Sequence, residues 1–208
     1  MAVGFIQDFP GGGVDEYDAV VERMRLGGGL PEHALFHVAG NGPKGGLRVV
    51  DVWEDDDAFG AFAAQRIRPL AQELGLGQPH IHRFDVHNIR DQGGRRAAVG
   101  FFQVVQFSGL DEPGFDAMDA EILAEGVPAE LLYHVNGPRD DGGWIVADGW
   151  TDRGARDAFL EARVFPVAAR HPGVTAPRIE DLDVHATLEP GSERAAVGGA
   201  GGSGRRGD

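Results

Sequence analysis

The sequence contains no cysteine, which excludes disulfides, thiolate chemistry and cysteine-based zinc or iron–sulfur sites. It has no apolar run of about 18 residues and no basic-then-apolar segment after Met1, so we expect neither a membrane span nor a secretion signal. Positive charge is also scarce, because 19 Lys and Arg face 33 Asp and Glu for a net charge of −14. Without a basic stripe, such a chain repels nucleic acid and anionic membranes. We expect a soluble, cytoplasmic protein.

A nucleotide-binding glycine pattern is missing as well. The glycine triplets at 11–13 and 27–29 lack the lysine of a phosphate-binding loop and the strand–helix context of a dinucleotide site. We therefore expect no intrinsic flavin, nicotinamide or other cofactor. Hydrophobic residues, in contrast, make up 42% of the 208 residues, which is enough to build a packed core.

The sequence repeats itself at a fixed distance. The segment LFHV at 35–38 returns as LYHV at 132–135, and Trp53 returns as Trp150. The offset is constant, since 134 − 37 and 150 − 53 both give 97. Matches at one offset across half a chain indicate a duplicated unit.

Hydrophobic periodicity predicts the order strand, helix, strand, strand, helix, strand in each half. Pro69 lies inside a helical pattern, so we expect a kink or break there. The predicted strands are 3–7, 34–39, 47–53, 80–89, 99–107, 131–135, 144–150 and 178–188, and the predicted helices are 14–25, a segment from Asp55 or Asp56 to about residue 70, 113–124 and 153–169.

This order is that of the ferredoxin-like βαββαβ unit, a four-stranded antiparallel sheet with two helices on one face. The strand at 47–53 is apolar on both faces, which suits a sheet covered on both sides. We therefore predict an α+β fold in which two tandem ferredoxin-like units pack sheet to sheet around a pseudo-twofold axis as an intramolecular α+β barrel. The predicted divisions are a first repeat at 1–90, a linker at 91–97, a second repeat at 98–188 and a disordered tail at 189–208.

The chain resembles a known family in a strand that leads into a phenylalanine-bearing helix. In the first half His37 is followed by GGLRVVDVWE at 45–54 and then by Phe59 and Phe62, and in the second half His134 is followed by GWIVADGW at 143–150. These segments are similar to those of the dimeric α+β barrel proteins related to antibiotic-biosynthesis monooxygenases. Members of that family include cofactor-independent monooxygenases of polycyclic phenols, haem-degrading enzymes, chlorite dismutases, isomerases and cyclases.

His37 and His134 occupy equivalent strands and are the candidate catalytic residues. A neutral imidazole facing a pocket between sheet and helices suits removal of a proton from a phenol near neutral pH. Alternatively, each is a buried histidine whose ring bonds to a backbone carbonyl or to Asp51 and Asp148 respectively. The sequence leaves both interpretations open.

Further candidates are aromatic or cationic residues near these strands. The tryptophans could stack on a substrate ring or simply anchor the core, and the cationic side chains could orient a phenolate or pair with surface carboxylates. Tyr133 and Trp144 are aromatic residues of the second half that also carry polar atoms, and they favour the second half as the active one. The candidate substrate-binding residues are Trp53, Trp150, Trp144, Tyr133, Arg66, Arg163, His87 and His185.

Metal binding is a weaker interpretation. His80 and His82 share one face of a strand close to His87, but no acid at matching spacing is evident, so we expect no metal site. Haem-binding relatives carry the ligand histidine on the second helix of the unit, and here that helix has only His171 at its end.

The resemblance implies a small enzyme of secondary metabolism whose partner is a hydrophobic, aromatic, polyketide-like small molecule, with a cofactor-independent monooxygenase as the leading hypothesis. A non-redox cyclase or isomerase and a non-catalytic ligand-binding protein of the same fold are the alternatives. Two copies of the two-repeat chain can still associate as a homodimer.

Overall fold

The computed structural model describes residues 1–43, 45–92, 95–140, 142–171, 174 and 177–189. The tail predicted at 189–208 therefore lies, except for Glu189, outside the described residues, as do two glycines of the predicted linker. Within the described ranges, no helix combines the length and apolarity needed to cross a membrane.

The described elements follow the predicted βαββαβ order in each half. They are β1 (Val3–Phe9), α1 (Val14–Met24), β2 (Ala34–Asn41), β3 (Leu47–Trp53), α2 (Asp56–Phe62), the π-helical turn η1 (Ala63–Ile67), α3 (Arg68–Glu73), β4 (His80–Asp85), β5 (Asn88–Asp91), the 3₁₀ turn η2 (Arg96–Ala98), β6 (Phe101–Phe107), α4 (Glu112–Ile122), β7 (Leu131–Pro138), β8 (Trp144–Trp150), α5 (Arg153–Phe159), the π-helical turn η3 (Leu160–Val164), α6 (Phe165–Ala168) and β9 (Arg178–Thr187).

The strands form a nine-stranded sheet in the order β4-β1-β3-β2-β9-β6-β8-β7-β5, and all of its neighbouring strands are antiparallel. Two strand segments connect the halves. The N-terminal part of β9 pairs with β6 and its C-terminal part pairs with β2, while β5 pairs with β7. The protein thus has the predicted α+β class.

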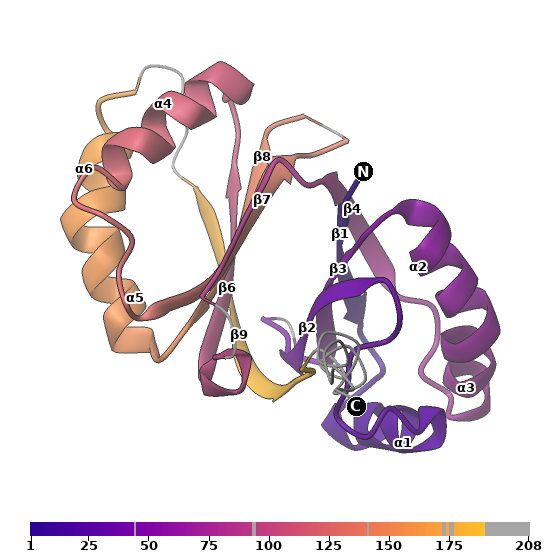
Figure 1. The fold of residues 1–208 in the computed structure, drawn as a ribbon. Coiled ribbons are helices and arrows are strands. Elements are labelled where there is room, and N and C mark those ends of the chain that lie inside the picture. Colours follow the sequence, from indigo (N-terminus) through magenta and orange to yellow (C-terminus); the bar gives the residue numbers. More distant parts are fainter. Residues whose placement is uncertain (44, 93–94, 141, 172–173, 175–176, 190–208) are drawn as a thin grey trace, which may run out of the picture.

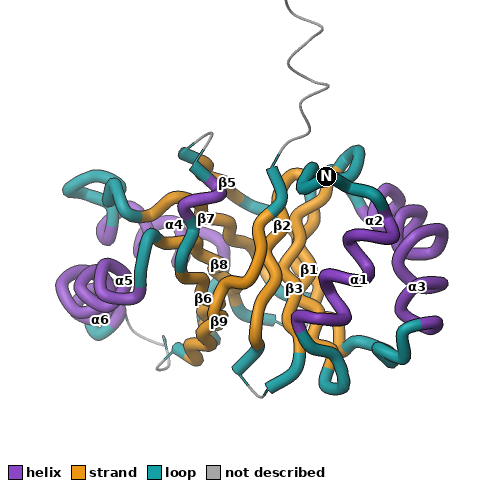
Figure 2. Tube along the Cα trace, turned by 90° about the horizontal axis from the view of Figure 1, so that it is seen from below, coloured by secondary structure: helices purple, strands orange, loops and turns teal. Residues whose placement is uncertain are grey.

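Helices cover the strands on two opposite outer sides. Figure 1 shows α1, α2 and α3 beside the strands of the first half and α4, α5 and α6 beside those of the second, and Figure 2 shows the strands between these two groups. Apolar side chains from both halves meet between the strands, where Phe36 and Tyr133 stack with ring centroids 3.6 Å apart. Every residue of β3 and β8 is buried, which confirms the expected burial of strand 47–53 on both faces.

The structure divides the predicted strand 80–89 into β4 and β5, which corrects the expectation of one continuous strand. The chain leaves β1 after Asp85, and Asn88 begins the pairing with β7. A Cβ on Gly137 would lie only 1.7 Å from the carbonyl oxygen of Asp85, so glycine permits a very close approach at this transfer. Asp91, assigned to the linker, belongs to β5.

Pro69 does not break the second helix. Asp55 caps that helix by accepting a hydrogen bond from the Ala58 N–H at 2.8 Å, as one of the two predicted caps. Before Pro69 the helix widens into η1, and Pro166 follows η3 in the same way. A proline has no N–H and clashes with the carbonyl four residues before it, so the wider π turn before each proline leaves room for the ring.

Candidate functional site

His37 and Asp51 form the centre of the first candidate site. They are direct cross-strand neighbours on β2 and β3, with Nδ1 of His37 2.6 Å from Oδ1 of Asp51. Gln7 on β1 donates from Nε2 to the other carboxylate oxygen at 2.7 Å. Because the carboxylate only accepts, Nδ1 of His37 carries the proton and Nε2 keeps its lone pair. The expected contact between His37 and Asp51 is confirmed, and it fixes the tautomer that a general base needs.

Tyr17 on α1 completes this hydrogen-bonded chain. Its hydroxyl oxygen lies 2.8 Å from Nε2 of His37. Burial raises the pKa of Tyr17, and the nearby carboxylates of Asp51 and Asp18 act in the same direction. The hydroxyl therefore stays protonated and donates to His37. The Tyr17 hydroxyl is thus hydrogen-bonded to the lone pair on Nε2 of His37, the candidate base.

The second half repeats the contacts among histidine, aspartate and glutamine, but a different residue faces Nε2 of the histidine. Nδ1 of His134 lies 2.7 Å from Asp148, and Gln103 donates to the same carboxylate at 2.9 Å. Nε2 of His134 faces Nδ2 of Asn136 at 2.7 Å, and the indole N–H of Trp144 donates to Oδ1 of Asn136 at 3.4 Å. Since an indole N–H can only donate, it fixes the amide with its NH₂ group toward His134. Asn136 lies within β7.

Arg156 extends the second arrangement into a closed network. Its guanidinium donates to Oε1 of Gln103 at 3.0 Å and to Asp181 at 2.9 Å. The corresponding first-half position is Phe59, which stacks on Phe5 with centroids 3.9 Å apart. The second network therefore has Asn136 at one end and Arg156 at the other.

Each histidine lines an apolar cavity between the sheet and its covering helices. The cavity beside His37 has a volume of about 60 Å³ and is lined by Tyr17, Val20, Trp53 and other apolar residues. The cavity beside His134 has about 50 Å³. Ligand sites usually measure about 300–1,000 Å³. Neither cavity holds a tricyclic ring unless its walls move.

A wide groove adjoins the first cavity. It has a volume of about 770 Å³ and shares Leu26, Pro31 and Phe62 with the lining of the His37 cavity. Two of its lining residues, Arg25 and His33, have backbone φ angles of 56° and 66°, in the left-handed region that non-glycine residues avoid. Arg25 is the left-handed C-cap at which α1 ends, with its backbone N–H bonded to the carbonyl oxygen of Glu22. The groove and the His37 cavity are thus adjacent along the three residues they share.

The aromatic candidates separate into different environments. Trp53 lines the His37 cavity, whereas Trp150 lies in a small core cluster with Phe101. Tyr133 faces the opposite side of β7 from His134, because successive strand residues alternate, and its ring is in the core between the halves. The expectation that Tyr133 favours a second-half pocket is therefore corrected. Trp144 contacts Asn136 and does not line the His134 cavity.

The cationic candidates lie apart from the two histidines. Arg66 lines the groove and donates to the carbonyl oxygen of Met24 at 2.6 Å, while Arg163 donates to that of Gly126 at 2.7 Å. His87 and His185 bond to carboxylates on α4 and α1 and line neither cavity. Trp53 therefore lines the His37 cavity, Arg66 lines the adjoining groove, and His185 meets the ring of Tyr17 edge-on with centroids 6.0 Å apart.

Sequence reasoning missed two kinds of site residue. Gln7 and Gln103 are polar residues within apolar strands and recur in both halves, which is a usable signal for a buried polar contact. Tyr17 fits the helical spacing of core residues, and nothing in the sequence separates it from them.

Comparison with known proteins gives a fold and no family. No family model matches the chain, and no curated protein matches it in sequence. A structure of a candidate monooxygenase from Fusobacterium nucleatum subsp. nucleatum matches with a TM-score of 0.68 and 14% identity, over 91% of this chain and 95% of that one.

Two further structures agree. A candidate monooxygenase from Lactobacillus acidophilus matches with a TM-score of 0.67 and 10% identity, over 91% of this chain and 97% of that one. An anthrone oxidase-like protein matches with a TM-score of 0.55 and 14% identity, over 94% and 96%. At these identities the likeness shows that the chain shares the α+β fold of monooxygenase-like proteins.

Proposed function

We propose that the chain is an enzyme that removes a proton from a hydrophobic aromatic substrate and lets the resulting carbanion react with O₂, as cofactor-independent monooxygenases do. The observation that carries this proposal is the chain Gln7–Asp51–His37–Tyr17, which ends in an apolar cavity. The carboxylate orients the imidazole and stabilises its protonated form, which is the requirement for a general base. The substrate proton passes through the hydroxyl of Tyr17 to Nε2 of His37.

Two differences between the halves support the first half as the active one. Nε2 of His37 faces a hydroxyl, which can pass a proton on, whereas Nε2 of His134 faces the amide of Asn136, which cannot. The wide groove also shares three lining residues with the His37 cavity. In this proposal His134 has a structural role and its network maintains the second half.

An anthrone is a suitable model substrate, because its acidic methylene carbon lies between two aromatic rings and a structural neighbour is described as anthrone oxidase-like. The base removes one methylene proton, and the carbanion and O₂ form a carbon–oxygen bond to give a hydroperoxide after protonation. The hydroperoxide then loses water. Anthrone plus O₂ thus gives anthraquinone plus H₂O, with carbon oxidised and O₂ reduced. The apolar walls keep bulk water from the carbanion.

Binding of three fused rings requires the cavity to widen. The His37 cavity of about 60 Å³ is bounded by α1 and by Phe62 and Ile67 at the two ends of the π turn η1. We infer that α1 and the η1 segment separate as the substrate enters from the groove.

We also propose that the chain is a tandem duplication whose two units close into one barrel. Three observations support this: the constant offset of 97, the repeated βαββαβ order, and the pairing of β9 with β2 and of β5 with β7. With both units packed sheet to sheet, the cavities lie outside the barrel, beneath the helices.

Oxygen uptake and product analysis test the proposed activity. The protein is incubated with anthrone under air and under argon, and anthraquinone formation is compared with the rate without protein. We expect faster, O₂-dependent anthraquinone formation by the wild-type protein. Conversion to another product under argon would indicate a cyclase or isomerase. Unchanged anthrone that co-elutes with the protein would indicate a binding protein. Either result contradicts the proposal.

A further inference from the structure

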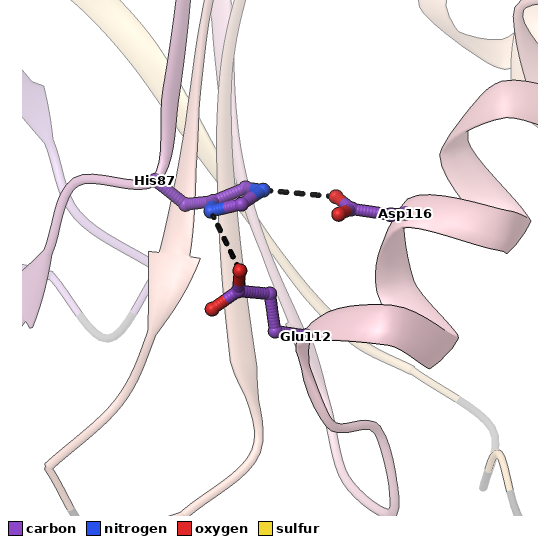
Figure 3. Close-up of side chains that lie close together, drawn as sticks. All are labelled: His87, Glu112 and Asp116. Atoms are coloured by element: carbon purple, nitrogen blue, oxygen red, sulfur yellow. Dashed lines mark hydrogen bonds and ion pairs between the residues drawn. The ribbon is translucent and has the colours of Figure 1, made fainter.

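A cluster of one histidine and two carboxylates lies away from both cavities. His87, between β4 and β5, has Nε2 2.8 Å from Oδ1 of Asp116 and Nδ1 4.0 Å from Oε1 of Glu112 (Figure 3). One ligand atom from each residue lies within 4.8 Å of the others. From this cluster we propose that His87, Glu112 and Asp116 bind a divalent transition-metal ion such as Zn²⁺.

The histidine is held in place while the acids can adjust. The backbone N–H of His87 donates to the carbonyl oxygen of Asn136 at 2.8 Å, and its ring meets Trp144 edge-on with centroids 5.3 Å apart. The carboxylate side chains of Glu112 and Asp116 are 64% and 55% exposed. Asp116 lies at Nε2 and Glu112 at Nδ1, so binding of one ion at one of these nitrogens requires the exposed carboxylate of the other acid to rotate toward it. Zn²⁺ binds carboxylate oxygens at about 2.0–2.2 Å.

The donor set selects the class of ion. Glu112 and Asp116 are four residues apart on α4, so their side chains share one face of the helix and point at the same ring. An imidazole nitrogen with two carboxylate oxygens suits Zn²⁺ or Mn²⁺, whereas Ca²⁺ and Mg²⁺ prefer oxygen ligands alone. The remaining coordination positions face solvent, where water can fill them.

The other half contains an incomplete copy of this cluster. His185 bonds to Asp18 with Nε2 2.8 Å from Oδ1, and the residue at the place of Glu112 is Val14. All three positions keep one offset, since 185 − 87, 116 − 18 and 112 − 14 each give 98. The His–Asp pair therefore occurs twice, but the third ligand occurs only in the second half. This difference provides a matched control within one chain.

The ion would fasten α4 to the sheet. His87 lies at the junction of β4 and β5, while Phe115 and Met118 of α4 line the His134 cavity. Sequence reasoning missed the site because the two acids follow His87 by more than twenty residues and become neighbours only in the fold. His80 and His82, which the sequence suggested instead, are not in this cluster.

Isothermal titration of the full chain with Zn²⁺ tests the proposal. We expect the wild-type protein and His185→Ala to bind one ion per chain with the same affinity. His87→Ala and Glu112→Val, the latter copying the other half, should bind at least about tenfold more weakly. Melting curves without metal check that each variant is folded. No saturable binding by the wild-type protein, or wild-type affinity in Glu112→Val, would overturn the proposal.

Discussion

The hydroxyl of Tyr17 donates a hydrogen bond to Nε2 of His37, with the two atoms 2.8 Å apart. In the proposed mechanism this hydroxyl passes the substrate proton to the ring, so Tyr17→Phe removes the relay and leaves the aromatic wall. We expect kcat on anthrone to fall by about 10²-fold or more, with little change in KM. Steady-state kinetics measure both. An unchanged or higher kcat would mean that the substrate displaces Tyr17 and contacts His37 directly.

Asparagine substitutions at Asp51 and Asp148 change equivalent histidine contacts in the two halves and so form a matched pair. Asp51→Asn removes the charge that orients His37 and stabilises its protonated form, so we expect kcat to fall by about 10²–10⁴-fold. Asp148→Asn changes the equivalent contact of His134 and should leave kcat within about twofold, because that network is structural. Equal losses in both variants would contradict the assignment of activity to the first half.

Both tyrosines of the chain are buried, and this predicts loss of stability in alkali. Burial raises the pKa of Tyr133, as it does that of Tyr17, so the folded protein keeps these protons at pH values where the unfolded chain, with a tyrosine pKa near 10.0, loses them. Above about pH 10 the unfolded state therefore binds fewer protons, and the free energy of unfolding falls by about 1.4 kcal/mol per pH unit for each tyrosine.

Tyr133→Phe tests this dependence at one of the two residues. Its hydroxyl has no hydrogen-bond partner among the described residues, and its ring stacks on Phe36, which a phenylalanine preserves. We expect the variant to be more stable by about 1 kcal/mol at neutral pH and to lose about half of the alkaline slope. Urea unfolding between pH 7 and 11 measures both, and an unchanged slope would refute the explanation.

Arg48 joins the two halves through a buried ion pair. This side chain on β3 is only 3% exposed and contacts Asp8 at 2.6 Å and Glu180 on β9 at 2.8 Å. Arg48→Met leaves Glu180 with Arg178 as its remaining cationic partner, so we expect a loss of about 1.5–3 kcal/mol in the free energy of unfolding.

Adding Glu180→Gln to Arg48→Met should recover part of that loss, because the amide is cheaper to bury than the charge. Denaturant unfolding of the single and double variants forms the comparison. A single variant within about 0.5 kcal/mol of wild type would show that this pair does not hold β3 and β9 together.

The sequence predicted most of the fold because its local signals agree with one another. Apolar residues on both faces of strand 47–53, the cap at Asp55 and the repeat all indicate the same arrangement. Boundaries failed where long-range geometry decides, as at Asp85, where a strand changes partner beside Gly137. Local patterns carry no information on such a close approach of distant segments.

The candidate site could be predicted in part. The contact between His37 and Asp51 was foreseeable as one of two options, because a strand pair brings them together. The positions of Tyr17 and Asn136 depend on how a helix lies on the sheet and on the rotation of side chains, which periodicity does not determine. For the same reason Tyr133, which looked like a pocket residue, lies in the core.

The central claim is that His37, and not its equivalent His134, is the general base. The most direct test measures O₂ uptake with anthrone for His37→Gln and His134→Gln, each checked for folding by its melting curve. We predict a loss of about 10²-fold or more in kcat for His37→Gln and a kcat within about twofold of wild type for His134→Gln. Full activity in a folded His37→Gln variant would contradict the account.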